Sequence, residues 1–176
     1  MLVTQGTIAN VDLSQLIEPT LTGLANENVH VIAALGRDPK GLSIPVPENA
    51  RVESFIPFGK VLPRADVFIT NGGYGSVNHA LSEGVPIVIA GTTDDKAFVS
   101  ARVEWSGAGI NLKTDNPSAD QVRDAVHAVL TDARYRNRAR EMQANFAKYN
   151  AFREIVSAIE SLLGERDQPR PLEEAR

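Results

Sequence analysis

The sequence predicts one doubly wound α/β domain, with a parallel sheet covered by helices on both faces. Short apolar runs alternate with segments of helical periodicity, which is typical of strands buried between two helical layers. The chain has 176 residues, 43% hydrophobic and 23% charged, which suits a single domain. No repeat or shift in composition marks a second domain. We assign residues 1–163 to the domain and the charged, proline-containing residues 164–176 to a disordered tail.

The N-terminal segment predicts a strand followed by a helix. The apolar run 2–4 ends at a polar, glycine-containing turn. Asp12, with Gln15 three residues later, is a capping-box pattern that predicts a helix start. Apolar side chains then recur at helical spacing, namely Leu13, Leu16, Ile17, Leu21 and Leu24.

Two further strands are predicted on either side of a loop rich in proline and glycine. The run 29–35 is apolar except for His30, which we expect to be an interior or edge residue of the strand. The loop covers residues 36–49, and the strand after it covers 52–56.

The centre of the chain is the most informative segment. An apolar strand at 67–70 turns through paired glycines directly into a helix. A Gly-Val-Pro break at 84–86 ends that helix, and the run 87–90 predicts the next strand. The alternation of strand and helix therefore continues without interruption.

The C-terminal part is mostly helical. A helix at 95–105 and a strand at 109–112 complete the predicted sheet, which gives a Rossmann-like architecture. Ser118 with Gln121 is a second capping-box pattern. The helix that it starts carries Val122, Ala125, Val126, Val129 and Leu130 at helical spacing. Two extra C-terminal helices are predicted at 133–148 and 151–163.

The glycine turn at 71–76 predicts an anion site. A strand that turns directly into a helix leaves unpaired backbone N–H groups at the positive end of the helix dipole, where a phosphate binds. Gly73 and Gly75 allow the backbone to approach the anion, and Ser76 adds a hydroxyl donor. Asn78 stands where a dinucleotide fingerprint has its third glycine, so that motif is not matched. A tight turn without a ligand fits the glycines equally well.

Two other loops follow predicted strands, and all three lie at the carboxyl edge of a parallel sheet, where such folds bind ligands. Thr7, after Gly6, offers a hydroxyl, although a simple turn is the better explanation of that glycine. The loop 91–96 offers carboxylates and hydroxyls suited to a sugar, unless Asp94 or Asp95 only caps the next helix.

Aromatic and histidine side chains add few candidates. Phe55 and Phe58 flank a rigid proline, and a ring there suits stacking on a base, but core packing is the simpler explanation for either ring. His79 lies one turn after Ser76 and is the only histidine that we expect to contact a ligand. No pair of histidines has metal-ligand spacing, so we expect no metal site.

Composition excludes several classes of protein. The net charge of -4 argues against a nucleic-acid partner. The absence of cysteine excludes disulfides and thiol catalysis and fits a reducing compartment. No apolar run approaches the roughly 20 residues of a membrane span, and the N-terminus has no secretory pattern. We therefore expect a cytoplasmic protein without a membrane span.

Four features together resemble the C-terminal half of nucleotide-sugar glycosyltransferases with the two-Rossmann GT-B architecture. They are Phe55-Ile56-Pro57, the segment 70–76, Gly84-Val85-Pro86 and Asp95-Lys96. The UDP-glycosyltransferase family, including macrolide-type bacterial members, is the most similar. The resemblance extends to Leu163, and it is specific because the order and the spacing of the features match.

The resemblance implies a UDP- or dTDP-sugar donor, no cofactor, and a role for each matching residue. Phe55 stands where the family commonly stacks a tryptophan on the base, and Thr7 matches the hydroxyl residue that meets the diphosphate. Gly73, Gly75 and Ser76 match the turn and helix start that hold the phosphates.

Three positions of the predicted site depart from the family pattern. Asp95 and Lys96 occupy the Asp-Gln pair that contacts the sugar hydroxyls, so Lys96 replaces glutamine. Asn71 replaces a histidine that meets the diphosphate, and His79 replaces a glutamate that bonds the ribose. The predicted donor site is Thr7, Phe55, Phe58, Asn71, Gly72, Gly73, Gly75, Ser76, His79, Asp95 and Lys96.

The resemblance also implies a missing half. Family members are much longer, and their N-terminal domain supplies the acceptor site and the general base, so no catalytic base is expected on this chain. The expected partners are a nucleotide-sugar donor and an N-terminal half in cis or in trans, with a homo-oligomer left open. In this architecture the last helix often crosses back to the N-terminal domain.

The sequence therefore predicts the donor-binding half of an inverting glycosyltransferase that moves a hexose to a hydroxyl of a small-molecule acceptor. Alone, the chain is expected to bind nucleotide without turnover. Two alternatives stay open. One is a regulatory or assembly subunit with a degenerate donor site, which Asn71 and His79 favour. The other is half of a sugar-nucleotide epimerase.

Overall fold

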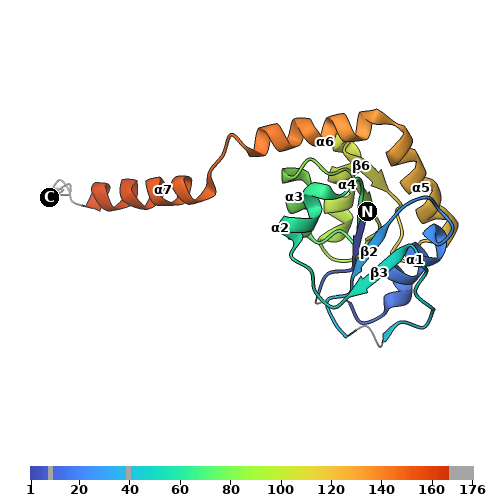
Figure 1. The fold of residues 1–176 in the computed structure, drawn as a ribbon. Helices are drawn as coiled ribbons and strands as arrows, with labels where there is room; N and C mark the ends of the chain where they lie inside the picture. Colours follow the sequence, from blue (N-terminus) through green and yellow to red (C-terminus); the bar gives the residue numbers. More distant parts are fainter. Residues whose placement is uncertain (8–9, 39–40, 167–176) are drawn as a thin grey trace, which may run out of the picture.

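The computed structural model describes residues 1–7, 10–38 and 41–166, and it confirms the doubly wound α/β fold (Figure 1). Six strands form one parallel sheet in the order β3-β2-β1-β4-β5-β6. The strand order therefore reverses between β1 and β4. The strands are β1 (Leu2–Thr4), β2 (Val31–Ala34), β3 (Ala50–Glu53), β4 (Phe68–Thr70), β5 (Ile87–Ile89) and β6 (Gly109–Asn111).

Helices cover both faces of the sheet (Figure 1). The first face carries α1 (Ile17–Leu24), preceded by the short η1 (Leu13–Gln15), and α5 (Ala119–Thr131). The second face carries α2 (Phe58–Val61), η3 (Leu62–Arg64), α3 (Tyr74–Ser82), α4 (Lys96–Ser106) and α6 (Ala133–Phe146).

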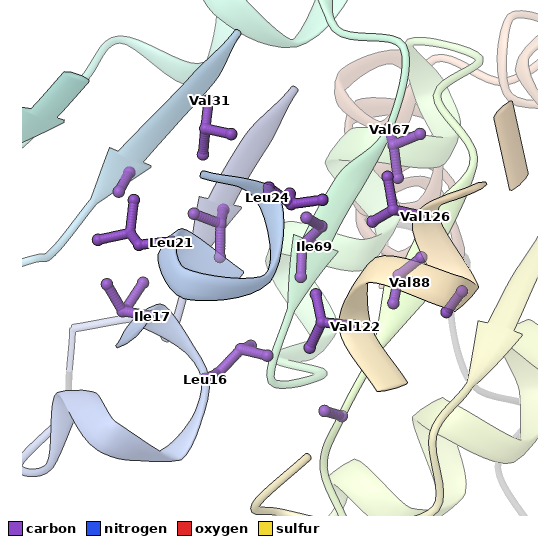
Figure 2. Close-up of a cluster of buried hydrophobic side chains, with 14 of the residues drawn as sticks. Leu16, Ile17, Leu21, Leu24, Val31, Val67, Ile69, Val88, Val122 and Val126 are labelled. Carbon is purple, nitrogen blue, oxygen red and sulfur yellow. The ribbon is translucent and has the colours of Figure 1, made fainter. Parts of the chain in front are cut away.

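The core is divided between these two faces because side chains alternate along each strand. In β4, Ile69 joins the cluster under α1 and α5, while Phe68 joins the cluster under α3 and α4. In β5, Val88 faces the first cluster and Ile87 the second. Figure 2 shows the first cluster, in which Leu21 and Leu24 of α1 and Val122 and Val126 of α5 close on the strands.

The capping box predicted at Ser118 is confirmed. The Ser118 hydroxyl accepts from the Gln121 N–H at 3.2 Å, and the Gln121 side chain accepts from the Ser118 N–H at 2.8 Å. The box predicted at Asp12 is wrong. The Asp12 carboxylate accepts from the N–H of Ser14, at 2.9 Å, and caps the short η1 helix, so that α1 begins only at Ile17.

Other differences lie around β2 and β3. His30 is exposed and precedes β2, so it is not an interior residue of that strand. Its carbonyl accepts from the Met1 amino group at 2.7 Å. Strand β3 ends at Glu53 rather than at 56. The chain after Pro57 forms α2 and η3, which together are too short to show an apolar period.

The last helix, α7 (Ala151–Arg166), extends away from the rest of the domain (Figure 1). It continues past the predicted end at 163, and residues 167–176 of the predicted tail lie outside the described residues. Its exposed apolar side chains are Phe152, Ile155, Val156, Ile159, Leu162 and Leu163. Of the helices in the described ranges, none has the length and apolarity to cross a membrane.

Candidate functional site

The three predicted loops meet at one edge of the sheet. Strand β1 pairs in parallel with β4, and β4 pairs with β5, so their carboxyl ends lie side by side. The loops that follow are 5–7, 71–76 and 91–96. The first two flank the point where the strand order reverses, which is where doubly wound sheets bind ligands.

The glycine turn after β4 has the geometry of an anion site. Gly72 has a φ of +92°, a backbone conformation that residues other than glycine rarely adopt. This conformation lets the chain turn directly from β4 into α3. Gly73 is the N-cap of α3 and offers no side chain to the first N–H groups of the helix. The Ser76 hydroxyl donates to the Gly73 carbonyl at 2.8 Å. The positive end of α3 therefore carries uncapped N–H donors.

Gly73 and Gly75 are not required by the packing of the fold. A Cβ at Gly75 would meet no atom within 4 Å, and one at Gly73 would meet only the Ser76 hydroxyl, at 3.4 Å. Neither residue has a positive φ. The space beside the α3 N-terminus is therefore open to a ligand.

Asn71 joins the two strand ends at the reversal point. Its side-chain amide donates to the Gln5 carbonyl at 2.6 Å. Gln5 is itself buried, and its side-chain oxygen accepts from the N–H groups of Leu16 and Ile17 at 3.1 and 3.0 Å. Asn71 thus fixes the edge of the site to the start of α1, a role that its place after the strand did not reveal.

A cavity of about 320 Å³, here called cavity A, lies on the β1–β3 side of this junction. Phe55 is 69% exposed and forms part of its wall, and Thr7 and Ser76 line it with hydroxyls. The remaining lining residues are Thr4, Gly6, Ala34, Gly36, Ser54, Ile56 and Phe58. The structure therefore brings an exposed aromatic ring and the start of α3 to one cavity.

The side chains of Phe58 and His79 mainly pack against neighbouring rings and contribute little to the cavity surface. The Phe58 ring contacts the Phe68 ring edge-on, with centroids 6.1 Å apart, and the His79 ring at 6.3 Å. Phe58 still contributes to the lining of cavity A, whereas His79 lines neither cavity A nor the smaller cavity described next.

The smaller cavity, cavity B, has a volume of about 40 Å³ and lies on the β4–β5 side of the junction. Lys96 lines it and pairs with the Asp94 carboxylate at 3.3 Å. Asp95 is exposed at the α4 N-cap, where its side chain makes no capping bond. The other lining residues are Gln5, Gln15, Leu16, Asn71, Ala90, Thr93 and Asp115.

Asp115 was missed from the sequence. Its carboxylate accepts from the Thr92 N–H, at 2.8 Å, and from the Thr92 hydroxyl. Partial burial raises the pKa of Asp115, but these hydrogen bonds and the nearby Lys96 charge outweigh it and leave the pKa below its ordinary value. Asp115 follows β6, so the strand-end rule that selected the other three loops would also have selected this one.

A third hollow of about 370 Å³ lies between α3, α4 and α6 on the outer face of the second helical layer. Its walls include Leu81, Phe98, Trp105 and Met142, so it lies along the helices and not at the strand ends. Within the described part of the chain, no group of three His, Cys, Asp or Glu residues could hold a metal ion. Cavities A and B with the α3 N-terminus are therefore the candidate site.

The fold and this edge define a Rossmann-like domain with a candidate ligand site at its strand reversal point. Residues 18–162 match the family described as erythromycin biosynthesis protein CIII-like, C-terminal domain. The chain belongs to this family of C-terminal domains of GT-B glycosyltransferases, which confirms the resemblance.

Individual proteins agree with the family. The chain is 47% identical over 161 residues to 4'-demethylrebeccamycin synthase of Lentzea aerocolonigenes and 41% identical over 166 residues to UDP-glycosyltransferase 2 of Phaeomoniella chlamydospora. Each match covers 92% of this chain but only 38% and 36% of the relative. The crystal structure of CalG4, the calicheamicin glycosyltransferase, superposes with a TM-score of 0.84 at 28% identity, over 96% of this chain and 42% of that one.

Proposed function

We propose that this chain is the donor-binding half of an inverting glycosyltransferase that moves a hexose from UDP or dTDP to a hydroxyl of a small-molecule acceptor. The observation that carries the proposal is the uncapped α3 N-terminus beside two glycines whose Cβ positions are open. The names of the two relatives, a UDP-glycosyltransferase and a synthase of a natural product, support a nucleotide donor and a small acceptor.

Each part of the edge then has a role. The base stacks on Phe55 in cavity A, with Thr7 and Ser76 toward the phosphates. The diphosphate lies at the α3 N-terminus, and the sugar extends toward Asp95 and Thr93. Gly72 shapes the turn, Phe58 forms part of the wall of cavity A, and His79 packs against Phe58.

In the transfer step, the acceptor oxygen forms a bond to the anomeric carbon while the bond from that carbon to the diphosphate oxygen breaks. The electron pair of the broken bond leaves with the diphosphate, and the acceptor proton goes to a base on the other half of the enzyme. The N–H groups and dipole of α3 stabilise the charge that develops on the leaving group. This chain therefore contributes to the departure of the leaving group and not to activation of the acceptor.

We further propose that a missing N-terminal half, in cis or in trans, covers the apolar face of α7. Two facts support this: the chain spans little more than a third of its named relatives, and Ile155, Ile159 and Leu162 are exposed. The family and its named members do not favour half of an epimerase or a regulatory subunit.

Calorimetry of the 176-residue chain with UDP and dTDP tests the proposal. We expect binding of at least one of them and no hydrolysis or transfer of the corresponding hexose donor. No heat from either nucleotide at millimolar concentration, with the protein shown to be folded by its thermal transition, would contradict the donor site.

A further inference from the structure

Lys96 is the residue of the site whose burial the fold does not explain. It is the first residue of α4, it lines cavity B, and it is only 9% exposed. Lysine near a surface usually buries its aliphatic stem and keeps the ammonium in water. Here the whole side chain is 11% exposed, so little of it reaches solvent. Burial of an ammonium is unfavourable unless an anion compensates for the lost hydration.

The anion beside Lys96 compensates poorly. Asp94 lies 3.3 Å from the Lys96 ammonium, but its own side chain is 80% exposed. Water therefore competes for that carboxylate and weakens the pair. The other nearby acid, Asp115, also attracts the Lys96 ammonium, but its carboxylate already accepts two hydrogen bonds from Thr92. Among the described residues, Lys96 makes no other ion pair.

Lys96 also lies beside the glycine turn. A Cβ at Gly91 would come within 2.1 Å of the Asn71 carbonyl oxygen and 3.1 Å of the Lys96 Cβ. Gly91 thus lets the loop before α4 press against the turn that starts α3. Of the described residues that line cavities A and B, Lys96 is the only basic one. A nucleoside diphosphate placed at the α3 N-terminus has no other cationic side chain in these walls.

We propose that Lys96 binds the distal, sugar-bearing phosphate of the nucleoside diphosphate, and so selects diphosphates over monophosphates. This inference rests on the proposed function and reassigns Lys96 from the sugar hydroxyls to the leaving group. Asn71 provides only a neutral amide, and that amide already donates to Gln5. When the bond to the anomeric carbon breaks, the electron pair remains on the distal phosphate oxygen, and the Lys96 ammonium stabilises that charge without transferring its proton.

The test compares UMP with UDP, and dTMP with dTDP, by calorimetry on the full chain and on Lys96→Met. The wild-type protein is expected to bind the diphosphate at least about tenfold more tightly than the monophosphate. A hydrogen bond to a charged group typically changes affinity by at least about that factor. In Lys96→Met that preference falls to within about threefold, while monophosphate affinity is unchanged. Lys148→Gln is the control, since Lys148 is exposed on the chain after α6.

Stability separates a ligand role from a structural one. Because the Lys96 ion pair is weak, Lys96→Met is expected to melt at the same temperature as the wild type or higher. A lower melting temperature with an unchanged diphosphate preference overturns the inference, as does a wild-type chain that binds UMP and UDP equally. If Lys96→Met does not fold, Lys96→Gln is compared in the same way.

The binding data have two further outcomes. Loss of affinity for the sugar nucleotide alone, with UDP unaffected, assigns Lys96 to the sugar hydroxyls, overturns the inference and leaves the donor site intact. No binding of any nucleotide by the wild type overturns both proposals.

Discussion

At the scale of single residues, the glycine turn at 71–76 offers an anion its backbone N–H groups more than its side chains. Asn71 is occupied with the Gln5 carbonyl, and the Ser76 hydroxyl is occupied with the Gly73 carbonyl. At this turn, the donors left for an anion are the first N–H groups of α3. Removing a side chain at this turn is therefore a weaker test than adding one.

Gly75→Ala adds the smallest possible side chain at this turn. The methyl group meets no atom of the fold within 4 Å, and alanine loses less backbone entropy in a helix than glycine does. We expect the free energy of unfolding to rise by about 0.5–1 kcal/mol. We also expect UDP or dTDP affinity to fall at least about tenfold, because the methyl group takes the space of a phosphate oxygen.

Urea denaturation and calorimetry measure the two effects of Gly75→Ala. Gly59→Ala in α2 is the matched control, since its Cβ also meets no atom within 4 Å. The control is expected to bind nucleotide like the wild type. Unchanged nucleotide affinity in Gly75→Ala would place the phosphates elsewhere.

At the scale of elements, periodicity predicted the long helices and the buried strands well. Residues such as Leu21, Leu24, Val122 and Val126 recur on one face because that face packs on the sheet (Figure 2). Periodicity failed where an element is too short to show it, as in α2. The capping-box pattern failed at Asp12, whose carboxylate accepts from the Ser14 N–H and caps the short η1 helix instead.

The convergence of the three candidate loops was also predicted. The rule that strand ends converge selected the loops of β1, β4 and β5, and the structure places all three at one edge. The sequence could not predict that Asn71 bonds Gln5, or that Phe58 packs on His79, because these contacts depend on how distant elements meet. Whether the predicted residues bind a donor stays a prediction for the calorimetric tests.

The contact of α1 with α5 shows the same limit and gives a second prediction. A Cβ at Gly23 of α1 would lie 2.3 Å from the Ala119 carbonyl oxygen at the start of α5. Gly23→Ala is therefore expected to lower the free energy of unfolding by about 1–3 kcal/mol, although alanine is the better helix former. Urea denaturation measures the change, and a stabilised Gly23→Ala would show that the two helices separate at little cost.

At the scale of the whole molecule, the described residues bury the sheet on both faces, whereas the apolar side chains of α7 stay exposed. Helix α7 carries its apolar face into solvent, away from the sheet (Figure 1). An exposed apolar face on a helix favours association with another protein surface. In a solution of the isolated chain, the protein surface that can cover α7 belongs to a second copy of the chain.

The isolated chain is therefore expected to self-associate through α7, as measured by sedimentation equilibrium. Ile155→Glu is expected to weaken the association at least about tenfold, because burial of an isoleucine side chain contributes about 1.5–3 kcal/mol. Ser157→Glu adds the same charge to α7 without removing an apolar side chain and is the control. A wild-type chain that stays monomeric at every concentration would contradict this prediction.

The reversal of strand order between β1 and β4 has a consequence for folding. Gln5 and Asn71 are 66 residues apart in the chain, and α1, β2 and β3 lie between them. The entropy of closing such a loop is lost before the contacts across it form, so parallel pairing over this separation slows folding. During synthesis, the edge of the site cannot form until β4 has been made and has paired with β1. Nucleotide binding would therefore indicate that β1 and β4 have paired, because the proposed site forms only after these two distant strands are joined.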